Sequence, residues 1–390
     1  MMIERLALKD VYERLNAIPA VVLLGARQVG KTTLAKAIAT RIPSIYVDLE
    51  SAQGRAMLSE VRLFVQSQTQ KLIILDEVQR MPGIFEELRG IIDERRAGGR
   101  PNGQFLLLGS ASRELLRQSG ESLAGRVSYL ELSPISMREV DVEEINSLWL
   151  RGGFPESYLA SNPDASPRWR RDFIKTCLER DIPTFGIAVP SESLRRFWTM
   201  IAHLQGSTFN ASSLARSLEL SPKTASRYVE LLVDLLLVRR LEPWSGSVGK
   251  RLIRAPKVYI RDSGMCHALL GVASIDALLS HPVVGASWEG FVIENAPNSS
   301  PDDVNASFYR TQSGAEVDLV LEFPSGETWA VEIKKSLSPR ASKGFYIGSA
   351  DIGATRTIIA YPGDTYYHQG GGVEVVPVVQ LCEELAARRD

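Results

Sequence analysis

Eight consecutive residues near the N-terminus have the types and spacing that bind a phosphate group. The stretch Gly25–Thr32 reads GARQVGKT and satisfies the pattern GxxxxGK(S/T). Glycines in this pattern let the backbone curl so that successive N–H groups face a phosphate. Lys31 is expected to reach the β- and γ-phosphates of a nucleotide, and the Thr32 hydroxyl is expected to bind Mg²⁺. The predicted phosphate-binding residues are Gly25, Ala26, Arg27, Gln28, Val29, Gly30, Lys31, Thr32 and Thr33.

The residues on either side of this stretch predict a strand before it and a helix after it. Ala20–Leu24 is a short continuous apolar run, which is typical of a strand buried on both faces. Thr33–Ala39 has a composition that is compatible with a helix. Because a helix N-terminus adds partial positive charge beside a phosphate, this order supplies the setting that the motif needs.

Acidic and hydroxyl side chains end two further apolar runs. Lys71–Glu77 ends in Asp76 and Glu77, and Phe105–Ser110 ends in Ser110. An acid at the carboxyl end of a strand in a parallel sheet faces the ligand crevice. Asp76 is therefore expected to coordinate Mg²⁺, directly or through water, and Glu77 to activate the attacking water. Ser110 is expected to orient that water or to contact the γ-phosphate.

Two arginines, Arg113 and Arg126, follow in a polar stretch. Arg126 ends the segment Leu123–Arg126. It either reaches the nucleotide of a neighbouring subunit as an arginine finger or is an ordinary surface residue, and the residues alone leave both interpretations open.

Together these motifs resemble the AAA+ ATPases, in particular a compact prokaryotic group whose ATPase core precedes a separate C-terminal region. The resemblance implies an α/β fold with a parallel sheet, a P-loop core that hydrolyses ATP with Mg²⁺, and frequent assembly into a homo-oligomeric ring. It also implies that Arg126 occupies the finger position. The second-domain arginine that many AAA+ proteins add is not identified in this sequence. The resemblance rests on Gly25–Thr32, Leu72–Glu77, Leu106–Ser112 and Ser122–Arg126, and the segments Gly152–Glu156 and Leu178–Ile182 resemble the linking region of the group.

The middle of the chain predicts a winged helix. Ser212–Leu218 has helical spacing, and Ser221 is a good N-cap for a second helix that starts with Pro222 and continues to Leu237. Two helices with a tight turn between them fit helix-turn-helix geometry. The β-hairpin that completes the motif consists of Val238–Leu241, the Gly/Ser-rich tip Ser245–Gly249 and Val258–Ile260.

Basic residues are concentrated in this hairpin. The whole chain has a formal net charge of -1, yet the stretch Arg239–Arg261 contains Glu242 as its only acid. This local excess is the candidate for contact with DNA phosphates, and Trp244 is a candidate for stacking on an exposed base. The alternative is a winged helix that packs between domains or subunits. The basic residues are Arg239, Arg240, Lys250, Arg251, Arg254, Lys257 and Arg261.

A predicted β-hairpin in the C-terminal third brings two acids together. Its strands are Glu316–Leu321 and Thr328–Lys334. With Gly326 in the left-handed position of the turn, Phe323 pairs with Glu327, and counting back places Asp318 opposite Glu332 on one face, with Lys334 pointing the same way. A shift of one residue would send the two carboxylates to opposite faces.

Two carboxylates beside a lysine favour a hard cation, Mg²⁺ or Mn²⁺, held by Asp318 and Glu332. The metal would activate a water at a phosphodiester, and Lys334 would position this water or stabilise the developing charge. The arrangement resembles the PD-(D/E)XK nuclease fold, which implies that Glu289 on an upstream helix, rather than Glu294, completes the site. The same residues also fit an inactive domain that binds nucleic acid, or a purely structural role. Glu316, Lys335 and Tyr309 are further residues that we expect to line the site.

Length and composition predict a folded chain of several domains in the cytoplasm. The 390 residues exceed what one hydrophobic core usually supports. No apolar run approaches the ~18 residues that cross a bilayer, so we expect no membrane association, and we see no secretion signal near Met1. The predicted segments are an AAA+ ATPase core at 1–137, a helical linking region at 138–190, a winged helix at 191–265 and a nuclease-like α/β domain at 266–390.

Two functions fit these features. The leading hypothesis is a Mg²⁺-dependent ATPase that binds and hydrolyses ATP to remodel or act on DNA through the winged helix and the nuclease-like domain. The alternative is an ATP-dependent assembly or regulatory switch, in which the nuclease-like domain is catalytically inactive and binds a nucleic-acid or protein partner.

Overall fold

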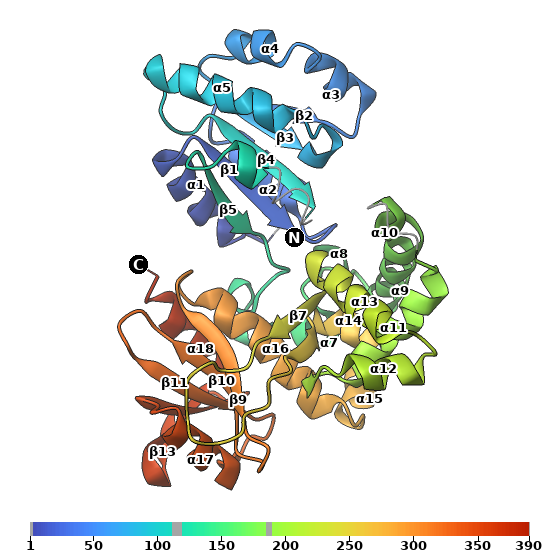
Figure 1. Ribbon diagram of the computed structural model, residues 1–390, viewed down its shortest axis with the longest axis vertical. Helices are drawn as coiled ribbons and strands as arrows, with labels where there is room; N and C mark the ends of the chain where they lie inside the picture. The colour runs from blue at the N-terminus through green and yellow to red at the C-terminus, as the bar shows by residue number, and fades with distance from the viewer. Residues whose placement is uncertain (1–2, 111–118, 185–188, 390) are drawn as a thin grey trace. The chain divides into compact units, whose positions relative to one another are not determined.

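The computed structural model describes residues 3–110, 119–184 and 189–389 (Figure 1). Arg113 and Ser112, which the sequence analysis names, lie outside these residues. Contacts between residues divide the chain into two compact units: residues Met1–Ile135 with Asp234–Leu236, and residues Ser136–Val233 with Leu237–Asp390. The finer division into four segments stays a prediction.

The first unit is built on a parallel sheet with the strand order β2-β3-β4-β1-β5. Strands and helices alternate along the chain, as expected when each parallel strand needs a crossover connection. This arrangement confirms the predicted α/β class with a P-loop type of sheet. The strands are β1 (Ala20–Gly25), β2 (Ser44–Asp48), β3 (Leu72–Asp76), β4 (Phe105–Ser110) and β5 (Val127–Glu131), and the helices are α1 (Ala7–Ala17), α2 (Lys31–Ala39), α3 (Ala52–Met57), α4 (Val61–Ser67), η1 (Val78–Arg80) and α5 (Ile84–Ala97).

The strand register brings the polar strand ends to one edge of this sheet. Gly25 at the end of β1 pairs with Ser110 at the end of β4, and Asp48 at the end of β2 pairs with Asp76 at the end of β3. Since β4 lies between β1 and β3, the loop after Gly25 and the acid Asp76 flank Ser110.

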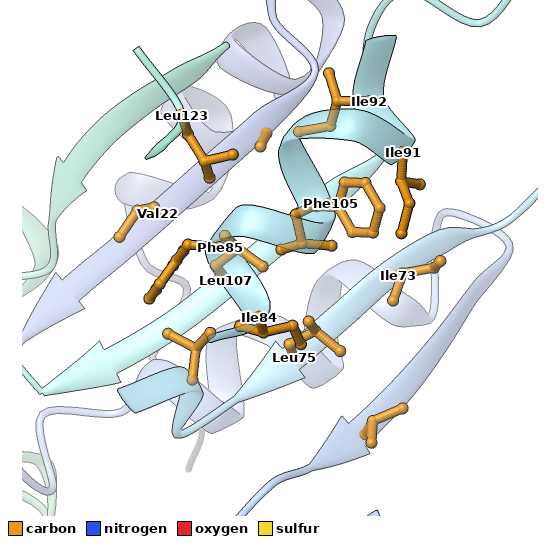
Figure 2. Close-up of a cluster of buried hydrophobic side chains, with 14 of the residues drawn as sticks. Val22, Ile73, Leu75, Ile84, Phe85, Ile91, Ile92, Phe105, Leu107 and Leu123 are labelled. Atoms are coloured by element: carbon orange, nitrogen blue, oxygen red, sulfur yellow. The ribbon is translucent and has the colours of Figure 1, made fainter. Parts of the chain in front are cut away.

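A hydrophobic cluster packs α5 against this sheet. Phe85 and Ile92 on α5 pack with Phe105 and Leu107 of β4, and all four side chains are buried (Figure 2). Burying a side chain of this size stabilises a fold by about 1.5–3 kcal/mol relative to leaving it exposed. The apolar runs found in the sequence thus form the interior of the sheet, and their polar ends lie together where the strands end.

The second unit begins with helices and a small sheet of order β6-β8-β7. The side-chain oxygen of Ser221 accepts a hydrogen bond from Thr224 N at 3.0 Å, which confirms the predicted cap before Pro222. The helix ends at Asp234, short of the predicted Leu237, because Leu236 takes a left-handed φ of 57° that turns the chain into β7. The elements are η2 (Met137–Glu139), η3 (Val142–Glu144), α7 (Ile145–Arg151), α8 (Pro155–Tyr158), α9 (Ala165–Thr176), η4 (Cys177–Asp181), α10 (Ile182–Thr184), α11 (Ser191–His203), β6 (Ser207–Thr208), α12 (Ala211–Ser217), α13 (Pro222–Asp234), β7 (Val238–Leu241) and β8 (Lys257–Ile260).

The C-terminal part of this unit forms a mixed sheet of order β13-β14-β12-β11-β10-β9. The strands β9, β10 and β11 are antiparallel, whereas β11, β12 and β14 are parallel. The elements are α14 (Ser263–Leu269), α15 (Ile275–Leu279), α16 (Val284–Ser299), β9 (Asn305–Arg310), β10 (Glu316–Glu322), β11 (Thr328–Ile333), α17 (Lys343–Asp351), β12 (Arg356–Tyr361), β13 (Tyr367–Gln369), η5 (Gly370–Gly372), β14 (Val373–Pro377) and α18 (Val378–Ala386).

The register of the β10–β11 hairpin is the predicted one. Leu319 pairs with Val331, so Asp318 falls opposite Glu332. Phe323 N donates to Glu327 O at 2.9 Å, and Gly326 has the left-handed φ of 89° that the turn requires. The local turn chemistry was sufficient to set this register.

The long connection between β7 and β8 does not form a free wing. Trp244 N donates to Phe308 O at 2.7 Å and Ile253 N donates to Arg310 O at 2.9 Å, so the connection lies along β9. Because β9 is the last strand of its sheet, its outer backbone groups need partners, and this segment supplies them. The prediction that Trp244 stacks on an exposed base is therefore wrong: its ring packs edge-on to Tyr309 at 5.9 Å, and its Nε1 donates to Glu322.

Candidate functional site

The loop between β1 and α2 has the geometry of a phosphate site. Gly30, just before the helix, has a φ of 102°, a conformation that a side chain rarely permits, and Gln28 is also left-handed at 62°. The first N–H groups of a helix have no partner within the helix and carry partial positive charge. Those of α2 follow directly on Gly30, so the predicted phosphate-binding residues form one continuous turn.

Lys31 is a buried cation that suits a phosphate. Its ammonium donates to Gly25 O at 2.8 Å and to Ala26 O at 2.9 Å, and the residue is only 6% exposed. Burial lowers the pKa of Lys31 to about 8, although Glu77 and Asp76 act in the opposite direction. A polyphosphate beside the loop would add the negative charge that restores the charged form.

Thr32 and Asp76 meet at a point that suits Mg²⁺. Thr32 Oγ1 donates to Asp76 Oδ2 at 2.7 Å, and Asp76 is 4% exposed. Carboxylate and hydroxyl oxygens are ligands that Mg²⁺ accepts, usually with several waters retained. The two residues are 44 positions apart in the chain, and the parallel sheet brings them together as the sequence motifs predicted.

Tyr46 is a member of the site that the sequence analysis missed. Its hydroxyl donates to Asp76 Oδ2 at 2.6 Å, the same oxygen that Thr32 contacts. Burial first, and then the hydrogen bond to Asp76, raise the pKa of Tyr46 well above its ordinary value, so it stays a donor. Tyr46 belongs to β2, which pairs with β3, and only that pairing reveals the contact.

Glu77 has the environment of a proton acceptor. It sits directly after β3 with a φ of 54°, a left-handed conformation that is uncommon for a residue with a side chain and is found at functional sites. Burial raises the pKa of Glu77, while Lys31 and a hydrogen bond from Gln79 act against this rise. A base whose pKa lies closer to neutral is better matched to proton transfer. Gln79 was not found from sequence.

Arg126 lies near the start of the strands, at the opposite end of the sheet from the phosphate loop. Ala20 N, at the start of β1, donates to Arg126 O at 3.1 Å, whereas the phosphate loop follows the end of β1. The guanidinium of Arg126 holds both carboxylate oxygens of Asp93 at 2.8 Å. It is therefore not part of its own subunit's site, and a role as a finger in a neighbouring subunit stays a prediction.

A second candidate site lies in the second unit and contains Lys257, which the sequence analysis counted in the basic stretch Arg239–Arg261. The ammonium of Lys257 lies 3.0 Å from Glu289, 2.8 Å from Glu316 and 3.7 Å from Asp318. The structure thus brings Glu289, Glu316 and Asp318 together around Lys257, whereas the sequence analysis grouped Glu289 and Asp318 with Glu332 and Lys334 and expected Glu316 only to line that site. We refer to these three acids and Lys257 as the Lys257 cluster.

Glu332 and Lys334 form a separate pair beside this cluster. Lys334 Nζ lies 2.7 Å from Glu332 Oε1, and Glu332 Oε2 accepts a hydrogen bond from Ser342 N. Asp318 Oδ2 accepts one from Ile333 N at 2.9 Å. Within the described parts of the chain, no group of three or more His, Cys, Asp or Glu residues is arranged to hold a metal ion. The expected Mg²⁺ or Mn²⁺ site of Asp318 and Glu332 is not supported, because the two carboxylates have different partners: Asp318 lies beside Lys257 and Ile333 N, whereas Glu332 pairs with Lys334 and Ser342 N.

Two residues expected to line this site have other partners. Tyr309 donates its hydroxyl to Asp351 at 2.7 Å. The ammonium of Lys335 lies over the rings of Trp149 and Trp288, at 5.0 and 4.9 Å.

Five of the seven basic residues of the stretch Arg239–Arg261 form ion pairs inside the second unit, and three of these five are largely buried, so only part of the stretch is available for the predicted contact with DNA. Arg239 and Arg261 both pair with the buried Glu294, at 2.7 and 2.6 Å. Burial would raise the pKa of Glu294, but the two arginines lower it to about 2. Lys250 pairs with Asp351 at 2.6 Å, and Lys257 is in the cluster above; Arg240 pairs with Glu242 at 3.4 Å. Arg251 and Arg254 are exposed.

Comparison with known protein families agrees with the P-loop fold of the first unit. A sequence-family model described as an AAA domain matches residues 18–141. Two models described as domains of unknown function, DUF8612 and DUF4143, match residues 142–276 and 284–381. The sheet, the phosphate loop and this match define the N-terminal part as an AAA-family P-loop ATPase domain.

Two mycobacterial proteins match nearly the whole chain. They are named uncharacterized protein Rv2008c of Mycobacterium tuberculosis and uncharacterized protein Mb2031c of Mycobacterium bovis, and each is 40% identical over 383 residues, which cover 98% of this chain and 85% of the relative. The chain belongs to the same family as these proteins. A solved structure, the Walker-type ATPase PABY2304 of Pyrococcus abyssi, is 15% identical with a TM-score of 0.49, covering 69% of this chain and 96% of that chain. No helix in the described residues has the length and apolar character to cross a membrane.

Proposed function

We propose that this protein binds and hydrolyses ATP with Mg²⁺ at the edge of the first sheet. The observation that carries the proposal is the meeting of Thr32 Oγ1 and Asp76 Oδ2 at 2.7 Å, next to the buried ammonium of Lys31. Bound Mg·ATP would supply a phosphoryl group open to attack by water and a counter-charge for Lys31. The loop N–H groups and Lys31 would bind the phosphates, while Thr32 and Asp76 would hold the metal.

Glu77 and Ser110 would act on the attacking water, Glu77 by accepting its proton and Ser110 by orienting it. Glu77 accepts a proton at its carboxylate, for which its raised pKa is favourable. Ser110 would orient this water, and its position at the end of the strand between β1 and β3 supports that role.

The test compares two variants that separate binding from chemistry. Lys31→Ala should lose tight nucleotide binding, whereas Glu77→Gln should retain binding and lose turnover, because only the proton acceptor is removed. Lys71→Ala, an exposed lysine at the opposite end of β3, is the matched control and should behave as wild type. Full turnover by Lys31→Ala would refute the assignment.

We further propose that the segment from α11 to β8 is a winged-helix-like element, with the β7–β8 connection packed along β9 rather than free, and that it contacts DNA through α13. Its element order and its antiparallel sheet β6-β8-β7 support this. Since the hairpin cations are largely paired, the exposed Lys223 and Arg227, one turn apart on α13, are the better candidates for phosphate contact. Each should reduce the slope of log affinity against log salt by about 0.9 when changed to Ala. DNA binding without salt dependence would count against this part of the proposal and favour a protein partner.

The Lys257 cluster favours the alternative role for the C-terminal domain. We propose an ATP-dependent switch in which a nuclease-like but catalytically inactive domain binds a nucleic-acid or protein partner, with assembly into homo-oligomers. Sedimentation with and without nucleotide tests the assembly: an unchanged monomer in both states would contradict it.

A further inference from the structure

The Lys257 cluster joins two parts of the second unit around one buried ammonium. Lys257 is the first residue of β8 and is 2% exposed. Glu289 comes from α16, and Glu316 and Asp318 come from β10. A single side chain from the small sheet therefore lies among three acids of the C-terminal domain.

The acids surround Lys257 in the way that ligands surround a cation. An ammonium offers three N–H donors and no acceptor, and three carboxylates lie within 3.7 Å of it. Glu289 also accepts a hydrogen bond from Tyr259 at 2.6 Å. Carboxylate oxygens are also the type of ligand that Mg²⁺ and Mn²⁺ prefer, so an ammonium here stands among side chains of that type.

The charge at this point matches a divalent ion. Arg310 lies 3.5 Å from Oε2 of Glu316, whereas Lys257 contacts Oε1, so two cations pair with this carboxylate. Burial alone would lower the pKa of Lys257, but Glu289, Asp318 and Glu316 together outweigh burial and raise it. Burying carboxylates is costly unless such partners are present.

We propose that Lys257 is a built-in cation that takes the place of a divalent metal among Glu289, Glu316 and Asp318, so that this domain works without a metal and is tied to β8 instead. This inference concerns the nuclease-like domain only and does not rest on ATP hydrolysis. It follows that removing the ammonium uncovers a divalent-cation site that the wild-type chain does not offer.

The proposal is tested by measuring Mn²⁺ binding to the full chain with spectroscopy of the bound ion. The measurement is made without nucleotide, and every protein carries Lys31→Ala so that the phosphate loop does not bind nucleotide. The parent chain should bind no Mn²⁺ that depends on Asp318. Lys257→Met keeps an unbranched side chain of similar length without charge, and it should gain one equivalent of Mn²⁺. Adding Asp318→Asn should remove this gain, and Lys250→Met, a lysine paired to Asp351 outside the cluster, should bind none.

Thermal unfolding covers the case in which Lys257→Met is poorly folded. Without the ammonium the three acids repel one another, so the unfolding temperature of this variant should fall and should recover with Mn²⁺, while that of the parent chain should not respond. Asp318-dependent binding of Mn²⁺ by the parent chain would overturn the proposal. So would a Lys257→Met chain that binds no Mn²⁺, or one that stays unfolded in its presence.

Discussion

The pH dependence of nucleotide affinity is the sharpest consequence of the buried Lys31. Its pKa is lowered to about 8 chiefly by burial, so the ammonium begins to lose its proton just above neutral pH in the nucleotide-free protein. Phosphates bind the protonated form, which means that binding restores the proton. Affinity should therefore be flat below this pKa and should fall as the pH rises through it.

The size of the effect follows from the pKa. One pH unit above it, about nine in ten lysines are neutral, so the dissociation constant should rise about tenfold, equivalent to about 1.4 kcal/mol. The phosphate groups are already fully ionised in this range, since their last pKa is about 6.

Calorimetry with a non-hydrolysable ATP analogue and Mg²⁺ measures this dependence. Titrations in two buffers of different ionisation enthalpy should also reveal proton uptake above neutral pH. Lys31→Arg is the matched control, because an arginine keeps its charge across this range and should abolish the dependence. An affinity that is constant between about pH 7 and about pH 9, or an equal fall in Lys31→Arg, would refute the reasoning.

Three further predictions concern contacts of both units. Tyr46→Phe removes a hydrogen bond to the Asp76 carboxylate, which is worth about 1.5–3 kcal/mol. ATP turnover by this variant should therefore need a higher Mg²⁺ concentration, while its nucleotide affinity without Mg²⁺ should stay near that of the wild type. A Mg²⁺ titration of ATP turnover measures this. Glu294 has its pKa lowered from 4.5 to about 2, so it stabilises the folded state above the higher value and loses this contribution as the pH falls toward the lower one. The free energy of unfolding of Glu294→Gln, measured by urea denaturation at neutral pH, should therefore be lower than that of the wild type by about 3–5 kcal/mol. Its stability should also depend less on pH in the acid range. Equal stability of the two proteins at neutral pH would contradict the role of this buried ion pair. Gly326→Ala forces a side chain into a left-handed turn and should cost about 1–2 kcal/mol in the same assay, with no effect on ATP turnover.

Features set by neighbouring residues were predictable. The phosphate loop and the apolar strand before it lie within a few positions of each other, and so do the turn and strands of the β10–β11 hairpin. Turn geometry and side-chain alternation act over that range, so the facing of Asp318 and Glu332 followed from counting residues back from Gly326.

Ion-pair partners were not predictable in the same way. The basic stretch appeared free for DNA because its acids come from distant parts of the chain: Glu289 is 32 residues from Lys257, and Asp351 is 101 residues from Lys250. Tyr46 and Asp76, 30 residues apart, meet only because β2 pairs with β3. The position of a charged residue in the sequence carries no repeating pattern from which its ion-pair partner can be identified.

The amino-acid sequence alone therefore determined the class of the first unit and the residues of its phosphate loop, because backbone conformation and strand ends depend on local pattern. The tertiary structure alone decided which charges are available, since electrostatic energy depends on distance and burial. Folding placed Lys257 beside Asp318 and left Glu332 paired with Lys334, an arrangement that the local sequence pattern does not reveal.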